Sequence, residues 1–202
     1  MIKKLALIIG FIICLSSCGK DYVYRIEGEL SNLEGQTVYA VFEKDNYKVV
    51  DTVACTKPGQ FQIDQNEAGF HCVTIFFADK EHWVTAYLEP GETVKITGDA
   101  NSPLLLQVKG GRTNDKLTAF KKKIAPLLTE LTNLSNSLNS KDLNDTIEET
   151  DIAARLANVN MQLSEEAIRY VKENPDEEAS VVLIQSFFSD LIFYQLSKKS
   201  TR

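Results

Sequence analysis

The sequence YRIEGEL, residues 24–30, alternates between charged residues and residues without charge. Tyr24, Ile26 and Leu30 would lie on one face of a β-strand, because successive side chains of a strand point to opposite faces. Arg25 and the two glutamates would lie on the other face. The stretch therefore predicts a sheet with one buried and one solvated face.

The same two-residue period continues to about Gly111 in short runs. The run from Cys72 to Phe77 is apolar on both faces, which favours a central, covered strand. The sequences Lys57-Pro58-Gly59-Gln60 and Glu89-Pro90-Gly91-Glu92 predict type II turns, because Pro presets φ at the second position and Gly supplies the positive φ of the third. Since the connections are too short for helical crossovers, we expect an antiparallel meander of about seven or eight strands, as a sandwich or an open, barrel-like sheet.

After Gly111 the apolar residues recur every three or four positions, which is typical of helices. One stripe runs from Leu117 to Leu138, with Thr113 or Asn114 as its expected cap and Pro126 as an expected break.

A second helix is predicted around Ile152–Tyr170, and a third one from Pro175, capped by Asn174 and apolar over most of its circumference. The sequence thus predicts an α+β protein, with a β domain over residues 18–111 and a helical hairpin or bundle of about three helices over residues 112–202.

The N-terminal residues carry the pattern of a bacterial lipoprotein signal. Lys3 and Lys4 precede an apolar run, Leu5 to Leu15, that is shorter than a membrane span. The sequence Leu15-Ser16-Ser17-Cys18 then resembles a lipobox, which implies cleavage after residue 17 and lipidation of Cys18. We expect a lipid anchor in the cell envelope, with the outer membrane facing the periplasm as the default location and the cell surface as the alternative.

The composition excludes several protein classes. The chain has 202 residues, is 44% hydrophobic and 25% charged, and has a formal net charge of −6. These values are those of a globular protein and exclude wholesale disorder, collagen and a polytopic membrane protein. Because no basic patch stands out, no nucleic-acid partner is expected.

Several short motifs resemble one family in their order along the chain. They are Tyr24-Arg25-Ile26-Glu27-Gly28, Val50-Asp51-Thr52-Val53, Pro58-Gly59-Gln60-Phe61, Leu88-Glu89-Pro90-Gly91-Glu92, Ile96-Thr97-Gly98-Asp99 and Val108-Lys109-Gly110-Gly111 with Asn114. This succession is similar to the domain of unknown function 4369, which precedes a thioredoxin-like domain in many Bacteroidota envelope thiol–disulfide reductases. The stretch Tyr170–Pro175 resembles the helical linker before that domain.

The chain departs from this family in its redox half. The family's thioredoxin domain uses Cys-x-x-Cys, which does not occur in this sequence. The resemblance therefore implies the accessory part of such a protein without the enzyme.

Besides the predicted lipidation residue Cys18, the predicted β domain has two cysteines, Cys55 and Cys72. An oxidising compartment permits a disulfide between them. Two alternatives stay open: a pair of unpaired, buried thiols, and a redox-active pair.

No other group announces catalysis. His71 and His82 have no second ligand at metal spacing, so no metal or cofactor is expected. Tyr39, Tyr47, Trp83 and Tyr87 are candidates for an aromatic binding face, although packing in the sheet is the commoner fate of such residues.

The function expected from these patterns is that of a non-catalytic, lipid-anchored envelope protein that serves as a binding or docking module. Its expected partner is an envelope protein such as a thioredoxin-like oxidoreductase. Two alternatives are a truncated thiol–disulfide oxidoreductase and a surface binder of glycans or small ligands.

Overall fold

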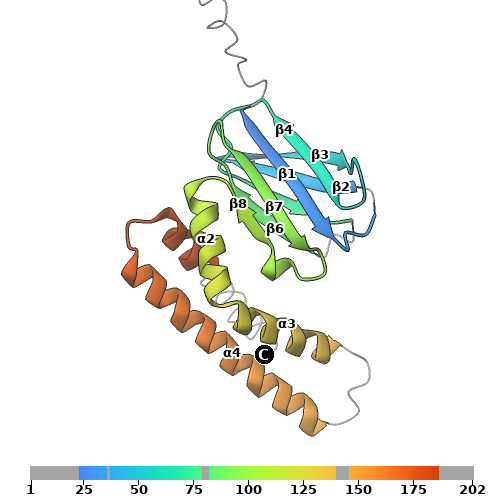
Figure 1. The fold of residues 1–202 in the computed structure, drawn as a ribbon. Helices are drawn as coiled ribbons and strands as arrows, with labels where there is room; N and C mark the ends of the chain where they lie inside the picture. Colours follow the sequence, from blue (N-terminus) through green and yellow to red (C-terminus); the bar gives the residue numbers. More distant parts are fainter. Residues whose placement is uncertain (1–22, 36, 79–81, 140–145, 187–202) are drawn as a thin grey trace, which may run out of the picture.

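The computed structural model describes residues 23–35, 37–78, 82–139 and 146–186 (Figure 1). Strands occupy the first part of this region and helices the second, which confirms the α+β prediction. The predicted signal, the lipidation residue Cys18 and the end of the third apolar stripe lie outside the described residues.

Within the described residues, eight strands form two four-stranded sheets that face each other (Figure 1). The first, called sheet A, has the order β4-β1-β7-β8, and the second, sheet B, has the order β3-β2-β5-β6. The strands are β1 (Tyr24–Ser31), β2 (Thr37–Lys44), β3 (Tyr47–Ala54), β4 (Gln60–Gln65), β5 (Cys72–Phe76), β6 (Trp83–Tyr87), β7 (Thr93–Asp99) and β8 (Gln107–Lys109). The sandwich alternative of the prediction is therefore the one observed.

The connectivity differs from the predicted meander. The chain changes sheets after β1, β3, β4 and β6, and β1 pairs in parallel with β7, with Ile26 opposite Val94. The alternation of side chains gives each strand's buried face but does not select its neighbour. A short loop can cross between sheets as easily as it can make a hairpin, so the meander prediction was wrong in strand order.

The core of the sandwich lies between the sheets and consists of the inward residues of both. In β1 these are Tyr24, Ile26 and Leu30, as the alternation predicted, each at most 5% exposed. β5 pairs with β2 and β6, so it is internal to its sheet, but its outward residues are only half-buried. It is thus not the fully covered strand that its composition suggested.

Both predicted type II turns are present. Gly59 has φ +75° and Gly91 has φ +82°, and in each turn the fourth residue donates a backbone hydrogen bond to the first. Pro and Gly at fixed positions decide such turns locally, which is why the sequence predicted them correctly.

The chain continues through one 3₁₀ turn into helices that extend away from the sandwich (Figure 1). Their bounds are η2 (Pro103–Leu105), α2 (Arg112–Lys123), α3 (Ala125–Asn139) and α4 (Thr146–Glu173), and residues 178–186 are again helical. Pro126 follows the break between α2 and α3, as predicted. Glu130 pairs with Arg155 and Lys123 with Glu166, so the α2–α3 segment and α4 run antiparallel.

Two predicted helix starts were wrong. The N-cap of α2 is Gly111, without a side-chain hydrogen bond, and Asn114 is already inside the helix. Pro175 lies in a turn, and the last helix begins at Glu178, where the Ser180 hydroxyl donates to the Asn174 carbonyl at 2.6 Å. The Asn114 side chain binds the backbone of Tyr87 and Gly110, and the Asn174 side chain donates to the Tyr170 carbonyl. A sequence pattern shows neither contact.

A second apolar core holds the helices together and includes Phe120, Ile124, Val159 and Leu163. Within the described ranges, no helix is long and apolar enough to cross a bilayer.

Candidate functional site

Helix α2 is fixed to the edges of both sheets by two buried polar side chains one turn apart. Asn114 accepts a hydrogen bond from the backbone N–H of Tyr87 at 2.9 Å and donates to the carbonyls of Tyr87 and Gly110 at 2.7 and 2.6 Å. Thr118 accepts from the N–H of Val108 at 3.1 Å and donates to its carbonyl at 2.5 Å. Because Tyr87 and Val108 lie on edge strands, α2 satisfies backbone groups that would otherwise have no partner in the sheets.

The outward side of sheet B carries an exposed apolar surface. Tyr39, Phe76 and Trp83 stand opposite one another on β2, β5 and β6, and the rings of Phe76 and Trp83 are 6.1 Å apart. Val41 and Val50 form the next row on β2 and β3. Trp83 is 54% exposed and Val50 is 64% exposed, which is unusual for large apolar residues of a sheet. We call these five residues the apolar face.

The four aromatic residues singled out in the sequence do not form one surface. Tyr39, Trp83 and Tyr87 point outward from sheet B, whereas Tyr47 has the inward orientation at the start of β3. Its ring packs edge-on against Phe70, and its hydroxyl donates to Glu67. That hydrogen bond raises the pKa of Tyr47. Tyr39 and Tyr87 are half-buried, so Trp83 supplies the one strongly exposed ring among the three.

A cleft opens where β6, η2 and α2 meet the helix of residues 178–186. Its volume is about 350 Å³, and its wall is mainly apolar, with Leu104, Leu117, Phe120 and Val182 among the lining residues. Trp83 lines it as well, so the cleft adjoins the apolar face. We call it the sheet–helix cleft.

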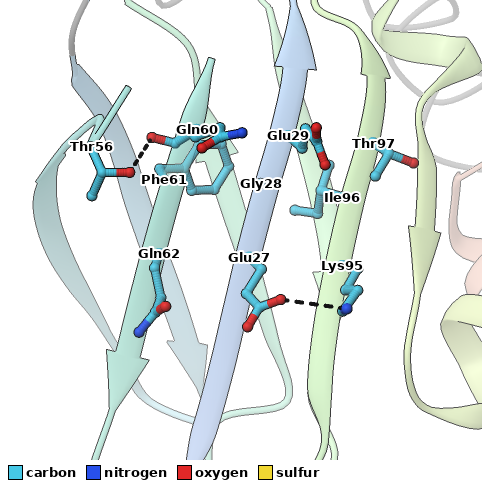
Figure 2. Close-up of a pocket in the computed structure, with 10 residues that line it drawn as sticks. All are labelled: Glu27, Gly28, Glu29, Thr56, Gln60, Phe61, Gln62, Lys95, Ile96 and Thr97. Carbon is cyan, nitrogen blue, oxygen red and sulfur yellow. Dashed lines mark hydrogen bonds and ion pairs between the residues drawn. The ribbon is translucent and has the colours of Figure 1, made fainter. Parts of the chain in front are cut away.

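The outward side of sheet A is polar. A shallow hollow of about 270 Å³ lies on it, and Figure 2 shows Gln62, Glu27 and Lys95 in a row across β4, β1 and β7. Lys95 and Glu27 form an ion pair at 3.7 Å, and the ring of Phe61 is only 3% exposed. Because none of the described residues that line the hollow is an exposed aromatic residue or a cation without a partner, it has the character of an ordinary solvated sheet surface.

The two cysteines lie at opposite ends of β2. Cys72 stands opposite Glu43, and Cys55 follows Ala54, which stands opposite Thr37. Six residues of strand separate these positions by roughly 20 Å, whereas disulfide-bonded Cα atoms lie about 4–7 Å apart. Both thiols are free in the structure. The geometry therefore favours the alternative of two unpaired thiols.

The electrostatics of Cys72 do not suit redox chemistry. Burial, together with the nearby Glu43 carboxylate, raises its pKa to about 11. Burial also raises the pKa of Cys55. A reactive cysteine requires a lowered pKa, so neither thiol has the environment of a catalytic one.

The histidines serve no common site. Nε2 of His71 lies 2.8 Å from Asp45 at an exposed loop, and His82 precedes β6. Among the residues that the structure describes, no cluster of His, Cys, Asp or Glu has the geometry of a metal site.

One family comparison gave a match. Residues 24–117 match the family model of a domain of unknown function (DUF4369). The matched segment begins with β1 and ends in α2 just after Asn114, so it contains the whole sandwich and the first contact that fixes α2. The part of the predicted resemblance that concerns this domain is confirmed. Neither the curated proteins nor the solved structures gave a match to the chain.

Sequence reasoning missed two features of these surfaces. Phe76 and Val50 were assigned to strands, but their outward direction depends on register, and β5 was expected to be covered on both sides. The sheet–helix cleft joins segments about 100 residues apart, so no local pattern announces it.

Proposed function

We propose that the protein is a lipid-anchored binding module of the cell envelope and that it docks a protein partner through the apolar face. The observation that carries this proposal is the aromatic row on sheet B, in which Trp83 is 54% exposed beside the half-buried Phe76 and Tyr39, together with the exposed Val50. Contiguous apolar surface of this kind marks interaction sites in folded domains. Aromatic residues in particular contribute much of the binding energy of protein interfaces.

The dimensions of the face suit a transient partner. Its five residues lie on four strands in two rows that are two residues apart, so the face measures roughly 14 by 7 Å. The corresponding area of about 100 Å² is far less than the about 800 Å² that each partner buries in a standard interface. The proposed partner class is an envelope oxidoreductase of the thioredoxin-like kind, because the domain match supports the accessory half of that arrangement. The proposed location is the periplasmic side of the outer membrane.

The docking proposal is tested by site-specific photo-crosslinking in cells. A photoreactive residue at position 50 should give one discrete crosslinked partner, whereas the same residue at Lys95 on the polar face of sheet A should not. Equal products from both positions, or none from position 50, would contradict docking through the apolar face.

The anchor is tested separately by Cys18→Ser. This variant should move from the membrane fraction to the soluble fraction and should no longer incorporate labelled palmitate. Retention in the membrane with unchanged labelling would contradict lipidation at Cys18.

The two alternative functions have less support. A glycan platform generally needs neighbouring exposed rings, and Trp83 has only half-buried aromatic neighbours on this face. A redox role of Cys55 and Cys72 would need a thiol of low pKa, and the pKa of Cys72 is raised instead.

A further inference from the structure

The polar side chains of the sheet–helix cleft are almost all occupied by the protein itself. Asn114 and Thr118 bind the edge strands, the Ser186 hydroxyl donates to the Val182 carbonyl at 3.0 Å, and the hydroxyls of Thr85 and Thr74 lie 3.1 Å apart. These groups are therefore not available to a ligand.

Lys121 is different. It lines the cleft from α2, it is half-buried, and no hydrogen bond or ion pair reaches its ammonium within the described part of the chain. Burial lowers the pKa of this amine, with no compensating acidic neighbour. By contrast, Lys116 and Lys123 on the same helix pair with Glu177 at 3.5 Å and Glu166 at 3.2 Å.

An ammonium without a partner in an apolar cavity is complementary to an anion that carries an apolar chain. Desolvation of a charge is unfavourable unless an opposite charge compensates it, and apolar side chains such as Leu117 and Phe120 would bury the chain of such a ligand. The volume of about 350 Å³ lies near the lower end of the roughly 300–1,000 Å³ typical of ligand pockets. It therefore suits one acyl chain of medium length and not a two-chain lipid.

We propose that the sheet–helix cleft binds a single-chain amphiphile with an anionic head group, and that Lys121 pairs with the head group. A free fatty acid and a lysophospholipid share this chemistry. This binding site goes beyond the docking function proposed above, because the ligand would enter the cleft, which shares only Trp83 with the apolar face.

Trp83 gives a direct readout, because it is the only tryptophan of the chain and lines the cleft. Decanoate should change its fluorescence saturably, and acetate, which lacks the chain, should not. Decyltrimethylammonium, which has the chain but a positive head, should bind at least about tenfold more weakly than decanoate. A parallel titration with lysophosphatidylglycerol, below the concentration at which it forms micelles, tells a lysophospholipid from a free fatty acid as the better ligand.

The variant Lys121→Met keeps the apolar stem and removes the charge, so decanoate affinity should fall about tenfold or more, as expected for a lost charge-assisted hydrogen bond. The neighbouring Lys122 is exposed and does not line the cleft, so Lys122→Met is the matched control and should leave the affinity unchanged. Circular dichroism of both variants checks that the fold is intact.

The proposal is overturned if neither decanoate nor lysophosphatidylglycerol changes the fluorescence of Trp83 saturably. It is likewise overturned if the Lys121→Met variant binds decanoate as tightly as the unmodified protein. It is also overturned if the cationic amphiphile binds as well as decanoate. None of these results bears on crosslinking from position 50, so failure of the cleft proposal and failure of the docking proposal are distinguishable.

Discussion

Replacement of Asn114 by Ala should destabilise the protein more than any other single change of an asparagine in the described residues. Asn114 is 2% exposed, and its three hydrogen bonds hold the backbone N–H and C=O of Tyr87 and the C=O of Gly110. Since β6 is an edge strand, no other strand in the described part of the chain replaces the lost partners.

The magnitude follows from the number of lost bonds. A neutral hydrogen bond contributes about 0.5–1.5 kcal/mol, and a buried group left without a partner costs about 1–3 kcal/mol. For three bonds around one residue, Asn114→Ala should lower the free energy of unfolding by roughly 2–5 kcal/mol. This is a large part of the about 5–15 kcal/mol that stabilises a typical domain.

Urea denaturation followed by circular dichroism and Trp83 fluorescence measures this loss. Asn158→Ala, at an exposed position of α4, is the matched control and should stay within about 0.5 kcal/mol of the original chain. Asn114→Asp sharpens the test, because a carboxylate keeps the acceptor for Tyr87 N–H but cannot donate to two carbonyls. It should be at least as destabilising as Asn114→Ala. If Asn114→Ala costs less than about 1 kcal/mol, or if Asn114→Asp is neutral, the reasoning about edge-strand satisfaction is wrong.

Three further predictions follow from the described geometry. Gly59→Ala should destabilise the fold by about 3 kcal/mol or more, because the added Cβ would lie 1.9 Å from the Leu30 carbonyl oxygen. Gly91 has a similar φ, but an added Cβ would meet nothing within 4 Å, so Gly91→Ala should cost only about 1 kcal/mol. Equal losses of unfolding free energy in the two variants would refute this prediction. Cys72, with a pKa of about 11, should react with a thiol reagent at pH 8 at least about tenfold more slowly than a cysteine in a peptide. Because Cys55 and Cys72 are free thiols, the intact mass of the protein should be the same with and without reductant. The hydrogen bond from Arg112, at 2.8 Å, lowers the pKa of Glu177. The pair therefore stabilises the fold above the ordinary glutamate pKa, and this stability is lost as the pH falls through the lower pKa of the folded state. Glu177→Gln should weaken the acid dependence of the unfolding free energy, and an unchanged pH profile would count against this linkage.

The strands and turns were largely predictable because their causes are local. Alternation in β1 gave its buried face correctly, and Pro-Gly at residues 58–59 and 90–91 gave two turns with the expected positive φ. Helix positions followed the apolar period, with the break before Pro126. Strand order was not predictable in this way, because β1 could satisfy its backbone with any neighbour of suitable register, and its partners β4 and β7 lie far along the chain.

The candidate site was predicted less completely than the fold. Trp83 and Tyr39 were named from their residue type, and the structure brings them onto one face with Phe76 between them. Tyr47 was grouped with them, but its position at the start of β3 gives it the opposite orientation. Asn114 was assigned to a helix cap because Asn is common there, and only the position of β6 shows that its amide binds a sheet edge instead.

The sequence by itself determined the class of the fold: a region of alternating residues with two Pro-Gly turns, followed by helices from about Gly111. These features depend on side-chain direction and backbone preference within a few residues, which the sequence contains. Only the tertiary structure decided which strands are neighbours, that the two cysteines are far apart, and that Lys121 faces an apolar cleft without a partner among the described residues. These depend on the packing of segments distant in the chain, where many arrangements satisfy the same local pattern and the total burial and hydrogen bonding select one.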